Sequence, residues 1–279
     1  IIGRTLGLKL SEAWKQPVIM DNRAGVAGSL GASIAAKSPP DGYTLLVGNV
    51  GPVAVNPQIY KAVEYDSIRD FTPITLAVTA PQIVVVHPSV PAKTFKEFNA
   101  LVVRQKGNLT YGSSGPGSIS HLCAELYKRM TKTDILHGPF KASAFITTAV
   151  ISGEIDAVFS DMAVVLPHVQ AGRLRALAVT GPKPSPLVPG LPTVSESGVP
   201  GFNMTSWWGM FGPAGMPRPI VTQLNTELVR ILKLPDVQKT FATLGVDAAT
   251  STPEELAALV KAEVPKYAKL ISDIGIPKQ

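Results

Sequence analysis

Short apolar runs alternate with longer stretches in which apolar residues recur every three or four positions. Residues 1–14 form the first long stretch and predict an amphipathic helix. The short runs predict β-strands at residues 18–20, 44–47, 74–78, 83–86, 109–111, 134–136, 157–159 and 174–179. Because strands and helices alternate, with Gly and Pro between them, the pattern predicts an α/β fold with a mostly parallel sheet.

After Pro217 the pattern predicts helices alone, at residues 220–232, 237–244 and 254–274. A helical tail of this kind commonly packs back on the first part of an α/β protein. We therefore expect a hinged, two-lobe architecture, with residues 1–80 and 208–279 in lobe 1 and residues 81–207 in lobe 2. The expected crossing segments lie near residues 79–86 and 203–213. Small ligands bind in clefts at such junctions.

Helix starts are marked by capping boxes, in which a Thr precedes a Glu by three residues. They occur at Thr94, Thr193 and Thr252. The third is followed by a proline, which suits the first position of a helix.

The composition excludes several classes of function. The chain has 279 residues, 45% hydrophobic and 16% charged, which suits a large buried core. Its apolar runs are far shorter than the roughly 20 residues that cross a bilayer. The net charge is +6, but Lys and Arg are scattered, so a nucleic-acid partner is not expected. The four histidines and the single Cys123 lack metal-ligand spacing, so neither a metal site nor a cofactor is expected.

The most informative segment is a glycine-serine turn at residues 112–118, between a predicted strand and a predicted helix. Glycines leave backbone N–H groups unshielded, and a helix N-terminus directs further N–H groups and a positive dipole end at the same place. The segment lacks the third glycine of a dinucleotide loop, the Lys-Ser/Thr pair of a triphosphate loop and the G-x-S-x-G nucleophile pattern. It therefore indicates either a site for a small anion or a plain strand-to-helix turn with a capping serine.

Seven ordered motifs resemble those of the Bug family, the periplasmic solute-binding proteins of tripartite tricarboxylate transporters. Together they extend along essentially the whole chain. They are residues 21–28 (DNRAGVAG), 35–46 (AAKSPPDGYTLL), 51–57 (GPVAVNP), 111–122 (YGSSGPGSISHL), 166–180 (LPHVQAGRLRALAVT), 191–198 (LPTVSESG) and 211–217 (FGPAGMP).

The resemblance implies a Venus-flytrap fold, similar to type II binding proteins, with the C-terminal helices packed on lobe 1. It also implies periplasmic localisation, capture of a small organic carboxylate, and delivery to the membrane permease subunits of a tripartite tricarboxylate transporter. Such carriers are expected to be monomers. The family normally begins with a strand and a Pro/Gly-rich loop that contributes to the anion site. Both are absent before Ile1, so we expect the record to be incomplete there.

The expected ligand contacts follow from the glycine-serine turn and from the resemblance. In lobe 2, Ser113, Ser114, Gly117 and Ser118 are expected to donate to a carboxylate. His121 either reaches the anion or is satisfied by a neighbouring carbonyl. In lobe 1, Asn49, Val50 and Gly51 are expected to form a second contact loop, with an ordinary turn as the alternative.

Two departures from the family pattern fall on loops that the resemblance places at the cleft. Phe140, Lys141 and Ala142 stand where the family usually has Tyr-Lys-Gly, and Ser160 and Asp161 stand where many members have Asp-Asn. The ligand is therefore expected to differ from the amino acids that some members bind. Asp161 either receives an amino or hydroxyl group of the ligand or caps the next helix.

Trp207 and Trp208 adjoin the second crossing segment. One of them is expected to stack on a ligand and the other to pack in the hinge. We include Trp207 among the candidate ligand contacts.

Two other functions compete with the carrier hypothesis. A hydrolase could use a serine, His121 and Asp161, but Ser118 and His121 have helix spacing and no nucleophile elbow is present. A sensory protein of the same fold would signal to a membrane partner instead of a permease. The sequence does not distinguish transport from sensing.

Overall fold

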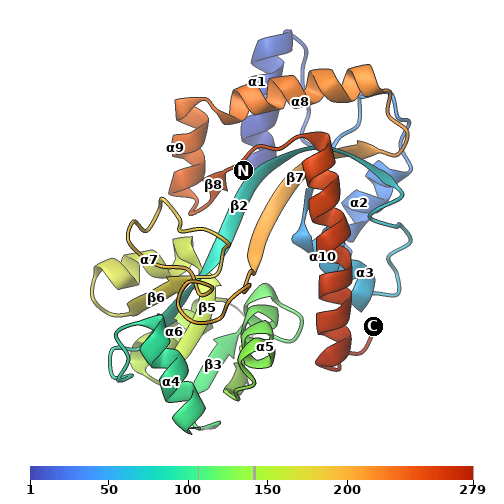
Figure 1. Ribbon diagram of the computed structural model, residues 1–279. Helices are drawn as coiled ribbons and strands as arrows, with labels where there is room; N and C mark the ends of the chain where they lie inside the picture. Colours follow the sequence, from blue (N-terminus) through green and yellow to red (C-terminus); the bar gives the residue numbers. More distant parts are fainter. Residues whose placement is uncertain (106, 141–142, 279) are drawn as a thin grey trace. The chain divides into compact units, whose positions relative to one another are not determined.

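The computed structural model describes residues 1–105, 107–140 and 143–278, and the chain forms two compact units (Figure 1). Unit 1 comprises Ile1–Thr79, Trp207–Thr243 and the chain from Asp247 onward. Unit 2 comprises Ala80–Ser206 and Leu244–Val246. The chain passes between the units inside strand β2 (Phe71–Val86) and near the beginning of strand β7 (Thr205–Pro213).

Unit 1 contains a small antiparallel sheet with helices around it. Strand β1 (Leu46–Asn49) pairs with β7, and β8 (Asp247–Ala248) pairs with the first half of β2. The strand order is β1-β7-β2-β8. The helical segments are α1 (Ile2–Trp14), η1 (Val26–Gly28), α2 (Ser29–Ala36), η2 (Gly51–Val55), α3 (Asn56–Ile59), α8 (Arg218–Leu232), α9 (Pro235–Thr243) and α10 (Pro253–Asp273).

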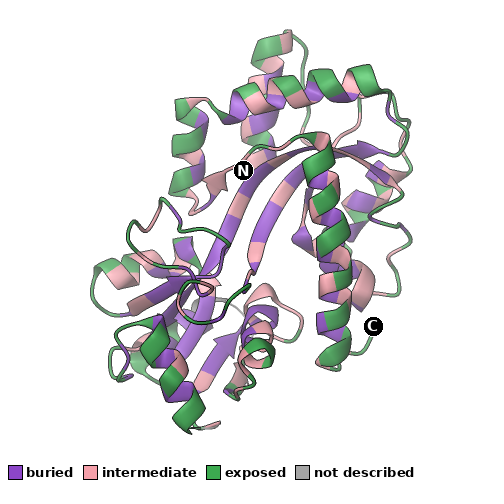
Figure 2. Cartoon of the chain, in the orientation of Figure 1, coloured by how far each residue is buried: buried purple, intermediate pink, exposed green. Residues whose placement is uncertain are grey.

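The helices of the C-terminal part belong to unit 1, and the last begins where its capping box predicts. Thr252 accepts from the Glu255 amide, and the Glu255 side chain accepts from the Thr252 amide. Helix α10 then buries one side, including Leu256 and Tyr267. In Figure 2 its colouring accordingly alternates between buried and exposed positions.

Unit 2 is a three-layer α/β structure. Its sheet contains the second half of β2 with β3 (Thr110–Ser113), β4 (Leu136–Pro139), β5 (Ala157–Asp161) and β6 (Arg175–Val179). Strand β2 runs antiparallel to β5 and β6, whereas β3 runs parallel to β4 and β5. The helices are α4 (Phe95–Gln105), α5 (Ile119–Thr131), α6 (Ser143–Ser152) and α7 (Met162–Gln170).

The alternation of side chains along β5 explains the layers. Val158 belongs to an aliphatic cluster with Ile146 of α6 and Val165 of α7. The next residue, Phe159, faces the other side, where its ring lies 5.9 Å from that of Tyr127 of α5. Successive residues of a strand point to opposite faces, so the sheet is covered by helices on both faces.

The parallel strands of unit 2 place three loops at one edge of the sheet. Strands β3, β4 and β5 end at the same edge, and each is followed by a helix. The N-termini of α5 and α7 therefore lie beside the carboxyl ends of these strands, which is where α/β folds bind small ligands.

The structure corrects several expectations about the strands. The sheet is mixed rather than mostly parallel, because β2 pairs only with antiparallel neighbours in unit 2. The runs at 74–78 and 83–86 are one strand, since Pro81 interrupts the apolar pattern but not the extended backbone. The crossing segment near 203–213 is strand β7. Residues 18–20 are not a strand, and Ile19 is largely exposed.

The capping box at Thr193 also differs from its prediction. Its reciprocal hydrogen bonds with Glu196 form, but the chain continues as turns instead of a helix.

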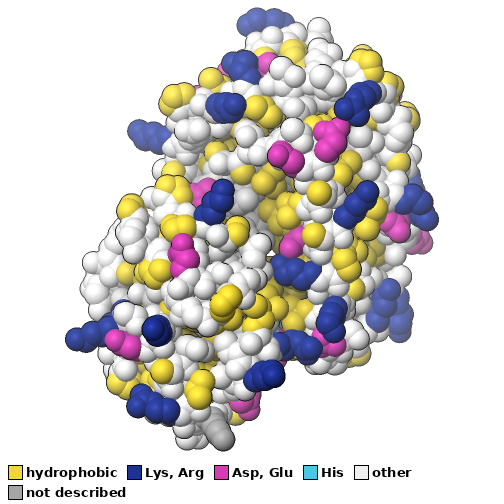
Figure 3. Space-filling view, in the orientation of Figure 1, with side chains coloured by type: hydrophobic (Ala, Val, Ile, Leu, Met, Phe, Trp, Pro, Cys, Tyr) yellow, Lys and Arg dark blue, Asp and Glu magenta, His cyan; other side chains and the backbone are white. Residues whose placement is uncertain are grey.

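In the part of the chain that the structure describes, no helix combines the length and apolar character needed to cross a membrane. Lys and Arg side chains on the face drawn in Figure 3 are spread singly, without a basic stripe.

Gly112 allows α6 to pack closely on β3, and we predict that Gly112→Ala destabilises the protein. An added Cβ would lie 2.5 Å from Ile155 Cδ1 and 2.7 Å from Ile146 Cγ2. Overpacking of this kind costs about 1–3 kcal/mol. Urea unfolding would measure the loss. The control is Gly31→Ala in α2, where the added Cβ meets nothing closer than 3.6 Å; equal stability of the two variants would contradict the prediction.

Candidate functional site

The loop between β3 and α5 is held by its own hydroxyl and amide groups. Ser113 is fully buried, and its Oγ accepts from the Gly115 amide at 3.1 Å. Ser118 is the N-cap of α5, with extended backbone angles. Its Oγ donates to the Gly115 carbonyl at 2.7 Å and accepts from the His121 amide at 3.3 Å. The Ser114 amide donates to Ser120 Oγ. Most polar groups of this loop are therefore paired within it.

Two amides at the start of α5 have no acceptor among the described residues. The first turn of a helix leaves its N–H groups without intrahelical partners. Ser118 Oγ satisfies that of His121, which leaves the N–H groups of Ile119 and Ser120. Both residues are half-buried. The exposed Ser114 hydroxyl lies on the same loop. These donors, with the positive end of the helix dipole, form a site suited to an anion.

A stack of three rings supports this loop from inside unit 2. The rings of Tyr111 and His137 are parallel within 15° with centroids 4.9 Å apart, and those of His137 and His121 are 4.4 Å apart. His137 Nε2 lies 2.6 Å from Ser113 Oγ. The Gly117 amide donates to His121 Nδ1 at 3.2 Å. The stack therefore fixes both ends of the glycine-serine turn.

The geometry requires His121 to be neutral. An amide N–H only donates, so Nδ1 of His121 must carry a lone pair. Burial, followed by the neighbouring His137, lowers the pKa of His121 to about 4. Burial also lowers the pKa of His137. Tyr111 donates to Glu125 at 2.8 Å, which closes the network on the other side. Thus His121 carries no charge at neutral pH that could attract an anion.

Asp161 ends β5 at the same edge of the sheet. Gln82 Nε2 donates to Asp161 Oδ1 at 2.6 Å. Asp161 is the N-cap residue of α7, yet its side chain makes no capping hydrogen bond. Gln82 is buried and Asp161 is exposed. The carboxylate is therefore held by a neighbouring strand and not by its own helix.

The candidates of unit 1 gather where β1 ends. Asn49 lies opposite Trp208 in the β1–β7 pair, and Asn49 Oδ1 accepts from the Gly51 amide. Val50 is buried, and Gly51 begins the π-helical segment η2. Trp207, next along β7, is buried and its indole N–H has no partner among the described residues.

A second loop of unit 1 lies against η2. A Cβ added at Gly28 would be 3.7 Å from Pro52 of η2. The buried Asn56 side chain donates to the Ala27 carbonyl at 3.0 Å and to Ser29 Oγ at 2.9 Å. Val26 and Ala27 both have positive φ angles. Asn56 thus fixes the strained turn that precedes helix α2.

The structure places the predicted residues in two groups. Unit 2 contains Ser113, Ser114, Gly117, Ser118, His121 and Asp161, and unit 1 contains Asn49, Val50, Gly51 and Trp207. Ala142 lies outside the described residues. Within the first group, Ser113 Oγ and the Gly117 amide are engaged inside unit 2.

Sequence reasoning missed Ile119, Ser120, Gln82 and Asn56. The N-cap position of Ser118 was a usable signal for the first two, because the amides that follow a cap are the unpaired ones. No local pattern marks Gln82 or Asn56, whose roles depend on residues 79 and 27–29 positions away.

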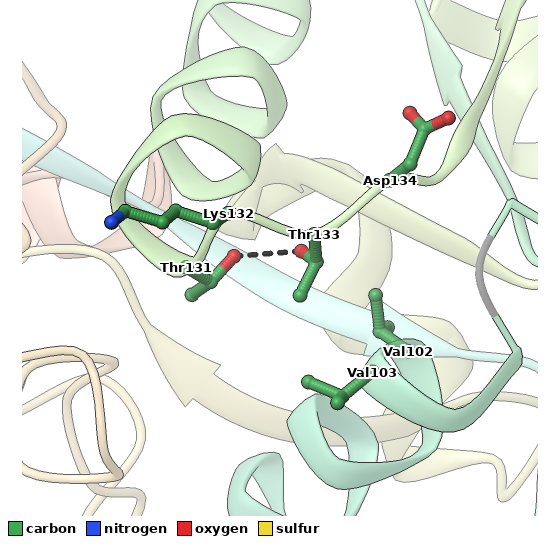
Figure 4. A pocket seen from close by; sticks show the side chains of 6 residues that line it. All are labelled: Val102, Val103, Thr131, Lys132, Thr133 and Asp134. Carbon is green, nitrogen blue, oxygen red and sulfur yellow. Dashed lines mark hydrogen bonds between the residues drawn. The ribbon is translucent and has the colours of Figure 1, made fainter.

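The pocket in Figure 4 is separate from this site. It is a hollow of about 370 Å³ lined by Val102, Val103, Thr131, Lys132, Thr133 and Asp134. It lies at the C-terminal end of α5, roughly 18 Å along the helix from its N-terminus at 1.5 Å per residue. Among the described residues no His, Cys, Asp and Glu side chains are grouped so as to hold a metal ion.

Comparison with known proteins identifies the family. Residues 2–276 match the family model described as the tripartite tricarboxylate transporter family receptor, TctC. The chain belongs to this family. A protein encoded in the tcbD-tcbE intergenic region of Pseudomonas sp. strain P51 is 35% identical over 97% of this chain and 80% of its own length.

Solved structures support the same assignment. Rpa4515 of R. palustris, with adipate, is 33% identical with a TM-score of 0.77, over 100% of this chain and 93% of that one. The periplasmic binding protein BugD is 30% identical with a TM-score of 0.73, over 100% and 93%. MatC of Rhodopseudomonas palustris, with bound malate, is 29% identical with a TM-score of 0.71, over 97% and 93%.

These findings confirm the resemblance to the Bug family and the two-lobe α/β fold class that it implied. They also confirm that the chain is a solute-binding protein rather than an enzyme, because the family is one of transporter receptors and BugD is a periplasmic binding protein. The alternative of a hydrolase that uses a serine, His121 and Asp161 is therefore set aside.

The buried neutral His121 predicts a loss of stability in acid. Its pKa is about 4 in the folded chain against an ordinary value of 6.5. Between these values the unfolded chain binds more protons than the folded one, so the free energy of unfolding falls as pH falls from about 6.5 to about 4. Protonation at Nδ1 would also break the hydrogen bond from Gly117.

We expect His121→Asn to make the free energy of unfolding less dependent on pH, because unfolding would take up about one proton fewer in this pH range. Asn Oδ1 can accept from the Gly117 amide without titrating. Urea midpoints at pH 7 and pH 4.5 would measure the change. His87→Asn is the control, because the His87 ring contacts Ser89 and is not part of the buried ring stack. An unchanged slope in His121→Asn would show that the acid loss has another origin.

Proposed function

We propose that this receptor captures a small organic carboxylate in the periplasm and delivers it to the membrane subunits of a tripartite tricarboxylate transporter. The observation that carries the proposal is the pair of amides at Ile119 and Ser120, which lack acceptors among the described residues. A carboxylate has two oxygens that can accept from two adjacent N–H groups. The proposal therefore places one ligand carboxylate at the N-terminus of α5.

The relatives support this choice of ligand class and compartment. Rpa4515 was solved with adipate and MatC with malate, and BugD is a periplasmic binding protein. Adipate and malate are both small acids with two carboxylates. The family description supports a transporter as the partner.

A site built from amides and hydroxyls suits a carrier. Burying a Lys or Arg side chain to meet the anion would cost several kcal/mol in desolvation. The amides at a helix end are already fixed in place, so they bind an anion without that cost and without ordering a long side chain. Such a site can hold its ligand and still release it.

We predict that Ser118→Asp weakens carboxylate binding by two orders of magnitude or more. The new charge would lie within about 4 Å of the ligand, where repulsion amounts to several kcal/mol at an effective dielectric constant near 20. Asp is as good an N-cap as Ser, so the helix should still form. Isothermal titration with whichever acid binds the wild type would measure the effect.

The matched control is Ser118→Asn, which caps the helix without adding charge. It should retain affinity within about tenfold. The acid itself would be found by thermal shift against mono-, di- and tricarboxylates, since a ligand that binds only the folded state raises its melting temperature. Equal binding by Ser118→Asp and Ser118→Asn would show that the ligand carboxylate does not bind at this helix end.

A further inference from the structure

Asp161 is not explained by a capping role. A residue at the N-cap usually accepts from an amide of the first turn, and this side chain does not. Instead, Oδ1 accepts from Gln82 Nε2 at 2.6 Å. Within the described part of the chain, no donor contacts Oδ2. The side chain is exposed, so one oxygen is anchored and the other is open to a ligand.

Gln82 is a rigid anchor. Its amide donates to Thr180 Oγ1 at 2.7 Å, and its carbonyl accepts from the Thr180 amide at 2.9 Å. Thr180 is fully buried, and its hydroxyl lies 2.6 Å from the Met204 carbonyl. Gln82 itself is 2% exposed. Because a carboxylate only accepts, the NH₂ group of Gln82 must face Asp161. This fixes the direction of the contact.

The register brings Asp161 close to the amides of α5. Strands β3 and β5 are parallel neighbours, with Gly112 opposite Val158. Three residues beyond this pair are Gly115, in the loop that follows β3, and Asp161, the last residue of β5. Adjacent strands are about 4.8 Å apart. A ligand whose carboxylate lies at Ile119 and Ser120 can thus present a nearby substituent to Asp161.

We propose that Asp161 selects carboxylic acids that carry a hydrogen-bond donor, a hydroxyl or an ammonium group, near the carboxylate. This inference rests on the proposed function and names the ligand class of that site. The anchored carboxylate repels a bare acid, whose negative charge would lie beside it. A hydroxyl or ammonium group satisfies the open Oδ2 and offsets this repulsion.

The test compares acids that share a carbon skeleton. Succinate, malate and aspartate differ only in carrying no substituent, a hydroxyl or an ammonium group. Propionate, lactate and alanine form a second such series, and glutarate, 2-hydroxyglutarate and glutamate a third. We expect wild-type protein to bind a substituted acid at least about tenfold more tightly than the bare one. Comparing the substituted acids separates hydroxyl from ammonium recognition.

Asp161→Asn should reduce this preference at least severalfold. The substitution removes the negative charge that repels the bare acid, whichever way the two side-chain amides at positions 82 and 161 pair. The bare acid should therefore gain affinity relative to the substituted acid. Asp161→Ala removes both the charge and the acceptor, so it should abolish the preference.

The outcomes separate this inference from the proposed function. If wild-type protein binds acids of these series without regard to the substituent, or if Asp161→Asn leaves the preference unchanged, the role of Asp161 is wrong and the carboxylate site stands. If wild-type protein binds none of the nine acids and no other mono-, di- or tricarboxylate of the thermal-shift panel, the proposed capture of small carboxylates is itself contradicted. Melting temperatures of both variants, expected within a few degrees of wild type, would verify that they fold.

Discussion

The contact between the glycine-serine loop and the histidine stack is the constraint on which the candidate site depends. His137 fixes Ser113 at the beginning of the loop, and His121 fixes Gly117 near its end. With both ends held, the loop has little freedom to turn its remaining amides inward. The first amides of α5 therefore stay available, and their orientation is established before any ligand arrives. Preorganised donors of this kind bind anions without an ordering cost at the moment of binding.

The same device occurs in unit 1 with different residues. There a buried amide side chain, Asn56, holds the turn before α2 through the Ala27 carbonyl and Ser29. In both units a neutral buried group fixes a glycine-containing turn that leads into a helix. Neutral groups suit this position because a buried charge would require a partner and would compete with the ligand for the turn's own donors. A neutral buried side chain at this position therefore leaves the backbone amides of the loop free.

The sequence predicted the strand-turn-helix at residues 109–127 and the capping serine, because both depend on local patterns. It did not predict how the loop is held, since that depends on His137, which is 24 residues from Ser113. The prediction of a mostly parallel sheet was wrong for a related reason. Apolar runs identify strands but not their partners, and β2 pairs with β5 across 79 residues at Gln82 and Asp161. β7 was missed because its glycines and tryptophans do not alternate with polar residues.

The role of Asp161 depends on its contact with Gln82, which is distant in the sequence, and not on the local sequence alone. From the sequence alone, an aspartate between a strand and a helix has two equal interpretations, a cap or a ligand contact. The bond to Gln82 removes the first by drawing Oδ1 towards the β2 side of the sheet. The N-terminus of α5 favours a negatively charged ligand group, whereas the Asp161 carboxylate before α7 repels negative charge and favours a hydrogen-bond donor. One molecule meets both demands when it carries a carboxylate and a donor group on neighbouring atoms. The selectivity that we propose for Asp161 would then follow from the pairing of two strand ends rather than from the shape of one loop.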